Sequence, residues 1–387
     1  MTHKNILIVG AGFSGATAAR CLVEKFPHIR VTVLDKRSHT AGNCHTSRDP
    51  VTGVMLHVYG PHVFHTDRQD VWNFVNRFAV FRPFILRTKT TTRGEAFGLP
   101  INLHTINQFF RKNFTPQEAR DFIATKADKS IIEAQNFEEQ ALKFIGPELY
   151  YAFFRGYTMK QWGCDPKMLP ASILKRLPLR FDYNDNYFND PYQGIPEQGY
   201  TAMVENLLDD SRICVKLNTE YVRDMSAAYD MTIYTGEIDR FFAYDEGRLR
   251  YRTVFWKTEK AIASQTECKT STITTSPDLK VYDLQGTAVM NFPDPDVPFT
   301  RKIEHKHFAP WETHAGSVLY TEFSKETEAD DTPYYPKRLS SDLLLLTKYQ
   351  KRASELPNIH FLGRLATYRY MDMHQVIGEA LDFVHVQ

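Results

Sequence analysis

Cysteine is scarce in this sequence, and neither sign of charge dominates. The five cysteines are odd in number, widely spaced and form no CxxC pair: Cys21, Cys44, Cys164, Cys214 and Cys268. This usage is typical of a reducing compartment, so we expect a cytoplasmic protein whose thiols act as small core residues. Lys and Arg total 47 and Asp and Glu total 46, with no basic block. That balance argues against a general nucleic-acid binder.

Long apolar runs are also missing. No segment approaches the ~18 apolar residues that cross a bilayer, and the run Ile6–Val9 is far shorter than the core of a secretory signal. We therefore expect neither a membrane span nor a signal peptide. With 42% hydrophobic residues the chain is not disordered, and 387 residues predict two or three domains. Aromatic residues are plentiful instead, with 27 Phe and 20 Tyr against 4 Trp.

The first 35 residues carry the clearest pattern. A buried strand, a glycine-rich turn, a helix and a second buried strand follow in order: Ile6–Val9, Gly10-Ala-Gly12-Phe-Ser-Gly15, Ala16–Phe26 and Val31–Leu34. Gly10 permits the tight turn, Gly12 lets the backbone approach a pyrophosphate, and Gly15 allows close helix–strand packing. Asp35 can accept hydrogen bonds from an adenosine ribose. This context predicts dinucleotide binding, which an isolated GxGxxG would not.

Later segments are predicted to belong to the same nucleotide-binding domain. Strands are predicted at Ile213–Leu217, Tyr221–Arg223, Met231–Tyr234 and Ile359–Leu362. The last strand ends in Gly363-Arg364, and Asp372–Val384 then has helical spacing of its apolar residues. A strand, a glycine, a loop and a helix at the end of the chain close many FAD proteins over the flavin. This arrangement favours FAD over a nicotinamide cofactor.

Two other patterns interrupt this domain. Residues 104–165 read as helical, with N-terminal caps at Thr115-Pro-Gln-Glu118 and Asn136-Phe-Glu-Glu139, whereas residues 246–323 alternate as strands. We predict an α/β protein with a discontinuous Rossmann-like FAD-binding domain, an inserted helical domain and an antiparallel β-sheet substrate domain. The expected boundaries are 1–68, 199–245 and 345–387 for the FAD domain, 104–170 for the helical domain, and 69–103, 171–198 and 246–344 for the sheet domain.

Histidine clusters offer weak signals for chemistry. His57, His62 and His65 match no standard zinc spacing, so we expect no metal and a structural role for His57 and His65. His62 follows Gly-Pro, a turn where the backbone could approach a flat cofactor. His305 and His307 are expected on the surface of a strand. Ser14 and Ser172 lack a GxSxG context, which leaves a hydrolase triad little support.

A mixed run, Gly156-Tyr-Thr-Met-Lys-Gln-Trp-Gly163, ends a predicted helix. Core packing would not place Lys160 and Gln161 beside Trp162, so we interpret the run as a binding surface. Positive charge in Leu174–Arg180 and tyrosines in Asp185–Phe188 and Pro333–Pro336 could hold phosphates, and rings can stack on a nucleobase. Together these segments suggest an anionic substrate that bears a ring.

Long ordered motifs resemble the bacterial UDP-galactopyranose mutases, essentially from end to end. The matching stretches are 35–43, 59–66, 156–163, 185–188, 192–196, 300–308, 333–336 and 363–375. The resemblance implies a reaction in which UDP-galactopyranose and UDP-galactofuranose interconvert with reduced FAD and no net redox. It further implies that flavin N5 forms a covalent adduct with the sugar after UDP leaves, and that the protein supplies binding and electrostatics.

Site residues carry over from the resemblance by position. Those expected at FAD are Gly10, Gly12, Ser14, Gly15, Asp35, Asn43, His62, Val63, Val222, Arg364, Met373, His374, Gln375 and Val376. Those expected at the substrate are Phe153, Tyr157, Thr158, Trp162, Arg176, Tyr187, Asn291, Arg301, Tyr335, Tyr370 and Leu86. Arg176 and Arg301 are implied to hold the diphosphate, and the loop around Arg176 to close over it. His62 is implied to lie beside the isoalloxazine; with the two arginines it completes the expected catalytic set.

Two positions depart from the family pattern. Ala41 stands where a glycine is usual, and one methyl group should be tolerated. Leu86 stands where several members carry a polar residue that faces the sugar. An apolar residue would suit a sugar lacking a hydroxyl, so dTDP-fucose or UDP-N-acetylgalactosamine are alternative substrates. A flavin oxidase or dehydrogenase, and a non-catalytic nucleotide-binding protein, are further alternatives. The resemblance also implies a homodimer and a role in cell-surface polysaccharide synthesis.

Overall fold

The computed structural model describes residues 4–176, 179–262 and 283–387, and for Ser172, Lys175 and Arg176 it describes the backbone alone. A parallel five-stranded sheet has the order β10-β2-β1-β11-β17. Its strands are β1 (Lys4–Val9), β2 (Ile29–Leu34), β10 (Ile213–Lys216), β11 (Met231–Tyr234) and β17 (Ile359–Phe361). Three distant parts of the chain therefore build one sheet, as the sequence predicted.

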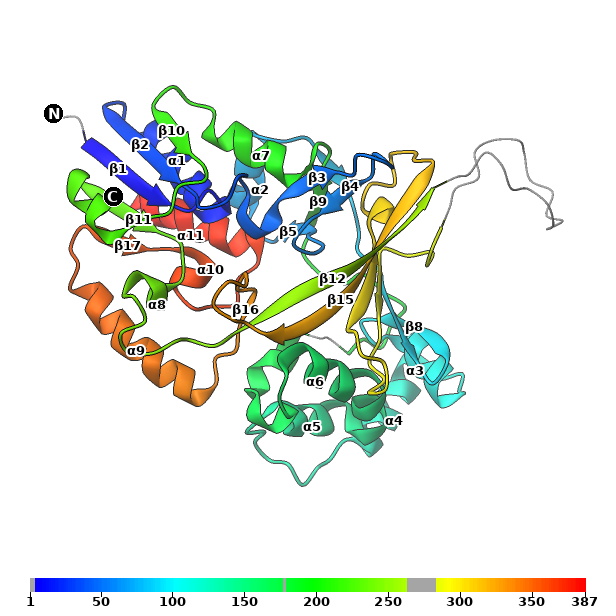
Figure 1. Ribbon diagram of the computed structural model, residues 1–387. Helices are drawn as coiled ribbons and strands as arrows, with labels where there is room; N and C mark the ends of the chain where they lie inside the picture. Colours follow the sequence, from blue (N-terminus) through cyan, green and yellow to red (C-terminus); the bar gives the residue numbers. More distant parts are fainter. Residues whose placement is uncertain (1–3, 177–178, 263–282) are drawn as a thin grey trace.

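Helices cover this sheet in layers (Figure 1). Helix α1 (Phe13–Lys25) packs against α11 (Met373–His385) and α7 (Gly199–Leu208), and α2 (Gln69–Val75) packs against α11. Their apolar faces bury one core with β1 and β2. A second core holds Tyr234, Phe241, Tyr349 and Phe361, contributed in part by α8 (Ile238–Phe241) and α9 (Ser340–Ser354). Helix α10 (Gly363–Ala366) follows β17 directly.

A seven-stranded sheet has the order β16-β12-β15-β14-β13-β7-β8. Its strands are β7 (Thr88–Thr92), β8 (Glu95–Leu99), β12 (Tyr251–Ile262), β13 (Val289–Asn291), β14 (Arg301–Glu304), β15 (Gly316–Glu326) and β16 (Tyr335–Pro336). The pairs are antiparallel as predicted, except that β13 and β7 run parallel. The long β12–β15 pair crosses the middle of the molecule (Figure 1).

The helical segment lies against one side of this sheet (Figure 1). It contains α3 (Leu103–Phe110), α4 (Pro116–Lys126), α5 (Phe137–Leu149), a π-helix η2 (Tyr150–Arg155), α6 (Gly156–Trp162), and the 3-10 turns η3 (Pro166–Met168) and η4 (Ala171–Arg176). Both predicted caps form, because Thr115 accepts from Glu118 N and Asn136 accepts from Glu139 N. Gly146, with φ of 76°, kinks α5 before Pro147.

Smaller elements complete the chain. They are the strands β3 (Thr46–Arg48), β4 (Met55–His57), β5 (Phe64–Thr66), β6 (Phe81–Pro83) and β9 (Tyr192–Pro196), and the 3-10 turns η1 (Gly42–Cys44), η5 (Arg223–Ala228) and η6 (His305–Phe308). Strands β3 and β4 pair, and β9 lies between β5 and β6. Within the described residues, no helix has the length and apolar character needed to cross a bilayer.

Two local predictions are wrong. Tyr221–Arg223 is not a strand: η5 begins at Arg223, and both the Tyr221 ring and the Arg223 guanidinium pack on the Phe241 ring instead of extending a sheet. His305 and His307 lie in the turn η6 rather than on a strand, and His305 is 0% exposed. Its Nδ1 accepts the His57 N–H at 3.2 Å, so packing against another histidine buries it.

Candidate active site

A single cavity of about 850 Å³ runs from the carboxyl ends of the parallel strands to the seven-stranded sheet. Residues that follow β1, β2 and β11 line one part, and residues of β13, β14 and β16 line the other. Ligands in open α/β sheets bind at the carboxyl ends of the strands, where helix N-termini attract negative charge. The cavity therefore joins a nucleotide-type site to a second site on the sheet.

The glycine-rich turn behaves as its spacing predicts. Gly10 has φ of +108°, and a Cβ on Gly15 would lie 2.0 Å from the Gly10 carbonyl oxygen, so this close packing requires glycine. A Cβ on Gly12 would meet no atom closer than 3.9 Å apart from its chain neighbours, and Gly12 lines the cavity. A ligand therefore has room against the backbone here. Asp35 lines the same end, where its carboxylate accepts the Ala11 and Arg37 N–H groups at 2.9 Å each.

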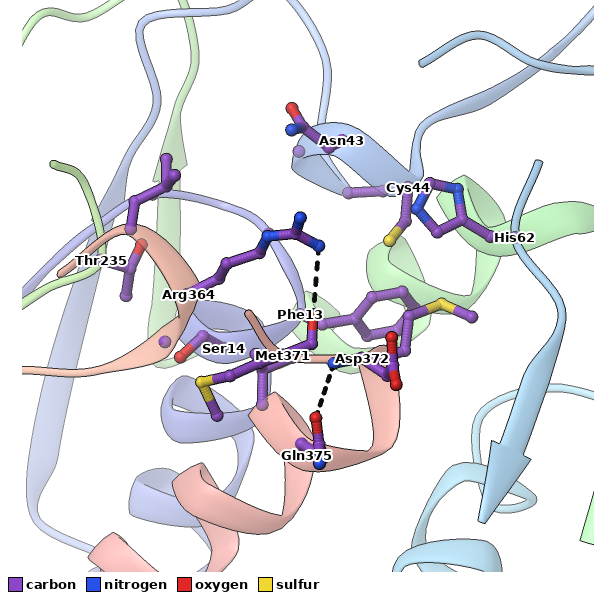
Figure 2. A pocket seen from close by; sticks show the side chains of 18 of the residues that line it. Phe13, Ser14, Asn43, Cys44, His62, Thr235, Arg364, Met371, Asp372 and Gln375 are labelled. Atoms are coloured by element: carbon purple, nitrogen blue, oxygen red, sulfur yellow. Dashed lines mark hydrogen bonds between the residues drawn. The ribbon is translucent and has the colours of Figure 1, made fainter. Parts of the chain in front are cut away.

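Several polar atoms in the cavity wall are buried without a hydrogen-bond partner among the described residues. They are Ser14 Oγ, Arg364 Nε and Nη2, and His374 Nδ1. Figure 2 shows Arg364 reaching across the pocket from α10, where Nη1 donates to the Met371 carbonyl at 3.3 Å. Buried donors without partners are costly in a folded protein, so these atoms indicate a bound ligand with acceptor groups.

His62 is held in a defined state on the opposite wall (Figure 2). Its Nδ1–H donates to the Gly60 carbonyl at 2.8 Å, which leaves Nε2 as an acceptor. Its backbone N–H donates to His57 Nδ1 at 3.2 Å, and its carbonyl accepts from the Tyr200 hydroxyl at 3.1 Å. Burial lowers the pKa of His62 to about 4, so the ring is neutral at physiological pH.

The sheet end of the cavity combines the Arg301 guanidinium with several tyrosines. Arg301 lines it, and the Nε and Nη2 of Arg301 bind Glu322 at 2.8 and 2.6 Å. Burial opposes the charge, but Glu322 outweighs it and holds the pKa of Arg301 above its usual value. The tyrosines that line this end are Tyr157, Tyr187, Tyr335 and Tyr370. Burial raises the pKa of Tyr157 and of Tyr335, so both hydroxyls stay protonated and can donate.

An apolar corner borders this polar wall. Leu86 is 9% exposed and lines the cavity together with Val63, Val289 and Phe308. These side chains belong to one buried cluster, and the Leu86 carbonyl accepts the Tyr187 N–H at 2.8 Å. A ligand group placed here would meet hydrocarbon rather than hydrogen-bond partners.

Most predicted site residues line this cavity, but some do not. Those that line it are Gly10, Gly12, Ser14, Asp35, Asn43, His62, Val63, Leu86, Tyr157, Tyr187, Asn291, Arg301, Tyr335, Arg364, Tyr370 and Met373–Val376. Gly15, Phe153, Thr158, Trp162 and Val222 do not. Phe153 packs edge-on against Phe97 in the helical core, and Val222 is 54% exposed. The Arg176 side chain lies outside the described part of the structure.

Other lining residues were not predicted. Tyr221 and Arg223, on either side of Val222, line the cavity, as do Arg240 and Phe241 near its nucleotide end. The fold rule that ligands bind beyond the strand ends could have indicated them, because Tyr221 follows β10 and Phe241 follows β11. Asp372 also lines the cavity, beside the Met373–Val376 segment.

One group of charged residues has the composition of a metal site. The ligand-type atoms of Asp283, Glu304 and His307 lie within 4.8 Å of one another. The Lys306 ammonium lies 3.8 and 3.9 Å from the two carboxylates, where it competes with a cation. None of these residues lines the cavity. The group is best described as an ion-pair cluster.

Comparison with known proteins decides the family. The family model described as UDP-galactopyranose mutase matches residues 152–370. A protein named as a probable UDP-galactopyranose mutase from Klebsiella pneumoniae is 51% identical over 381 residues, which cover 98% of this chain and 94% of that protein. This chain belongs to the UDP-galactopyranose mutase family.

Further comparisons of this mutase family member concern a second relative, the nucleotide-binding domain and the fold. A dTDP-fucopyranose mutase from Escherichia coli is 48% identical, over 98% of this chain and 97% of that protein. A model described as an NAD(P)-binding Rossmann-like domain matches residues 8–78. A crystal structure of reduced UDP-galactopyranose mutase shares the fold with a TM-score of 0.71 at 17% identity, covering 99% of this chain and 95% of that one.

FAD is the cofactor of this site. The residues present fit it: the glycine turn leaves space for a pyrophosphate, Asp35 retains acceptor capacity for a ribose, and the unpartnered donors of Ser14 and Arg364 face the cavity. The helix N-terminus at Gly12–Ser14 carries no side-chain cap, so its free N–H groups are available to an anion.

Proposed function

We propose that this mutase family member interconverts UDP-galactopyranose and UDP-galactofuranose, with reduced FAD and without net redox. The observation that carries the proposal is one continuous cavity that holds the FAD residues at one end and Arg301 with four tyrosines at the other. Reduced FAD, when bound, supplies the nucleophile for the anomeric carbon of the sugar. The chain itself binds, orients and stabilises charge around that carbon.

Arg301 is proposed to neutralise the diphosphate as UDP departs. Its guanidinium is fixed by Glu322, which is 0% exposed, so the cation needs no reorganisation when negative charge develops. Arginine can bind a diphosphate with paired hydrogen bonds. Tyr335 and Tyr370 stack with ring centroids 5.8 Å apart, and their hydroxyls are proposed to bind the same phosphates. Arg176 is proposed as the second diphosphate cation, carried by η4.

His62 is proposed to lie beside the isoalloxazine. Because its ring is neutral and Nε2 is an acceptor, it could bind a group that gains a proton on reduction. Phe153, Thr158 and Trp162 are proposed at the uridine and sugar on the strength of the resemblance. The ring centroids of Trp162 and Tyr335 lie 6.4 Å apart, which supports a place for Trp162 near the diphosphate end.

The decisive experiment is turnover under reducing conditions. Purified protein would be reduced with dithionite and given UDP-galactofuranose, and both isomers followed by chromatography. We expect the pyranose form to accumulate. Absence of interconversion for every nucleotide sugar tried would sink the proposal. An oxygen electrode separates it from an oxidase, because a mutase consumes no stoichiometric oxidant.

A second candidate, dTDP-fucopyranose, is favoured by the apolar corner at Leu86. Fucose is galactose with a methyl group in place of the hydroxymethyl group, and Val63, Val289 and Phe308 offer such a methyl hydrocarbon contact. UDP-galactose, UDP-N-acetylgalactosamine and dTDP-fucose should be compared as substrates of the wild type and of Leu86→Asn. If dTDP-fucose is the natural substrate, Leu86→Asn should lower its kcat/KM and raise that of UDP-galactose.

We further propose a cytoplasmic homodimer that serves polysaccharide synthesis, organised as an FAD unit (1–68, 199–245 and 345–387) with helical and sheet insertions. The odd number and wide spacing of the cysteines support a reducing compartment. Light scattering after gel filtration measures the mass in solution, and a monomer would contradict the dimer.

A further inference from the structure

Lys160 lies on α6, within the run 156–163, but does not line the cavity. The Lys160 ammonium donates to the carbonyls of Phe292, Asp294 and Val297 at 2.5, 3.0 and 2.9 Å. An ammonium has three donors and no acceptor, so one loop takes its full capacity. The sequence placed Lys160 on a ligand-binding surface; its ammonium is instead committed to backbone oxygens.

This loop connects two walls of the substrate end. Asn291 ends β13 before the loop, Arg301 begins β14 after it, and both line the cavity. On the other side of the contact, Tyr157 lies three residues before Lys160 on the same helix and also lines the cavity. Residues three apart share a helix face. Lys160 thus joins the helix that carries Tyr157 to the loop between Asn291 and Arg301.

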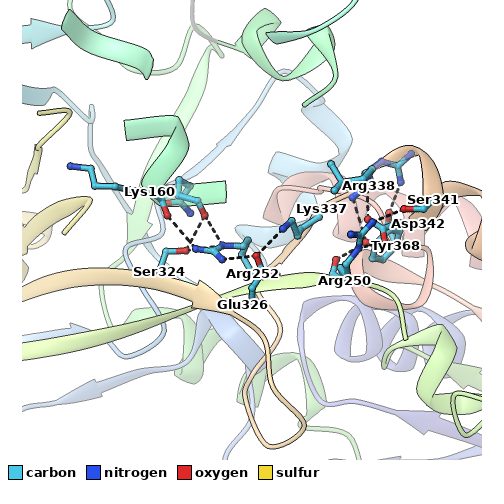
Figure 3. A network of polar contacts seen from close by, with 12 residues as sticks. Lys160, Arg250, Arg252, Ser324, Glu326, Lys337, Arg338, Ser341, Asp342 and Tyr368 are labelled. Atoms are coloured by element: carbon cyan, nitrogen blue, oxygen red, sulfur yellow. Dashed lines mark hydrogen bonds and ion pairs between the residues drawn. The ribbon is translucent and has the colours of Figure 1, made fainter. Parts of the chain in front are cut away.

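The helix and the loop also pack closely at Gly156, the first residue of α6. A Cβ on Gly156 would lie 2.1 Å from the Pro293 carbonyl oxygen, so only glycine fits there. At the other end of α6, Arg252 donates to the carbonyls of Lys160 and Gln161 at 3.2 and 3.0 Å. Figure 3 shows that these bonds reach the Lys160 backbone while its side chain points away from Arg252. The ammonium is therefore a separate attachment.

We propose that Lys160 is a positioning residue, whose ammonium fixes Tyr157 relative to Asn291 and Arg301 and thereby shapes the diphosphate end of the site. The inference rests on the proposed function, because it assigns those three residues to the nucleotide sugar. Deprotonation of the amine removes its charge and one of its three donors, so the attachment weakens as pH rises.

The surroundings place that change near neutral pH. Burial lowers the pKa of Lys160 to about 8, while the carboxylates of Asp294 and Asp296 on the loop oppose the shift. The Arg252 guanidinium faces the end of the helix from β12 and pairs with Glu326 on β15. Asp294 is itself held by Thr92 Oγ1 at 2.7 Å, so the loop has its own anchor on β7.

The test compares Lys160→Met with Lys143→Met, because Lys143 also donates to a backbone carbonyl, that of Ile132 at 2.6 Å, but is exposed and lines no part of the cavity. UDP binding would be measured by calorimetry on the FAD-loaded protein, and kcat and KM by chromatography. We expect Lys160→Met to retain FAD and to weaken UDP binding about tenfold, as a displaced contact wall should. Lys143→Met should match the wild type.

The pH dependence of UDP affinity distinguishes a lysine that positions the site from one that only stabilises the fold. Wild-type affinity for UDP should fall between pH 7 and 9, whereas Lys160→Met should be weak and flat, and Lys160→Arg, which stays charged, should lose the alkaline decline. If Lys160→Met does not fold, Lys160→Gln takes its place. UDP affinity within about twofold of the wild type, a difference below ~0.5 kcal/mol, would overturn the inference. A wild type that binds no UDP would instead refute the proposed function.

Discussion

The Arg301–Glu322 pair permits a test that separates folding from turnover. In Arg301→Met the Glu322 carboxylate, 0% exposed, loses the partner that binds it at 2.6 and 2.8 Å. Breaking a buried ion pair on one side costs about 3–5 kcal/mol of stability. Loss of a charged contact to the diphosphate costs roughly 2–5 kcal/mol in transition-state binding, or about 30-fold or more in kcat/KM. The single variant should therefore show both defects.

The double variant Arg301→Met, Glu322→Gln isolates the second defect. The glutamine oxygen can still accept the Thr300 hydroxyl, which lies 2.8 Å from the present carboxylate, and no buried charge remains. Stability from urea unfolding should recover to within about 1–2 kcal/mol of the wild type, while turnover of UDP-galactofuranose stays depressed. Recovery of turnover along with stability would refute the reasoning, because Arg301 would then act only through the fold.

Three further predictions concern single groups. Burial raises the pKa of Asp239 to about 6, so the native state binds the proton more tightly than the unfolded state, and the free energy of unfolding falls as pH rises from about 4 to 6. The loss amounts to at most ~3 kcal/mol between pH 4 and pH 7. Asp239→Asn should remove it, as measured by urea unfolding at the two pH values. A neutral His62 with a pKa of about 4 should give no limb in kcat/KM between pH 5 and 8, and a limb near pH 6.5 that disappears in His62→Asn would contradict this assignment. Gly15→Ala places a Cβ 2.0 Å from the Gly10 carbonyl, so purified protein should lose most of its absorbance near 450 nm; full flavin retention would argue against the tight helix–strand contact.

The nucleotide end could be predicted because its chemistry is local. Gly10, Gly12 and Gly15 all lie in one βαβ unit, Gly15 packs against the Gly10 carbonyl within that unit, and the strand Val31–Leu34 leads directly to Asp35. The turn after β17 was likewise predicted from a strand followed by Gly363. Short spacing in sequence is enough when the partners are neighbours in the chain.

The sheet end was harder to predict for the opposite reason. Lys160 binds carbonyls 132 to 137 residues away, and Arg301 depends on Glu322 across a strand pair. Backbone acceptors carry no signature in a sequence, so a lysine that binds them looks the same as one that binds a ligand. His305 was misplaced for a similar cause, since its partner is the N–H of His57, 248 residues away.

The topology of the parallel sheet also bears on how the protein is made. The strand order β10-β2-β1-β11-β17 draws on the beginning, the middle and the end of the chain, and Met373–Val376 of the last helix forms part of the cavity wall. A ribosome that has released only the first 350 residues has produced both the glycine-rich turn after β1 and Arg301, but neither β17 nor α11. FAD can therefore complete its contacts only after α11 has been made, and a premature stop anywhere before that helix yields a chain without a closed cofactor site.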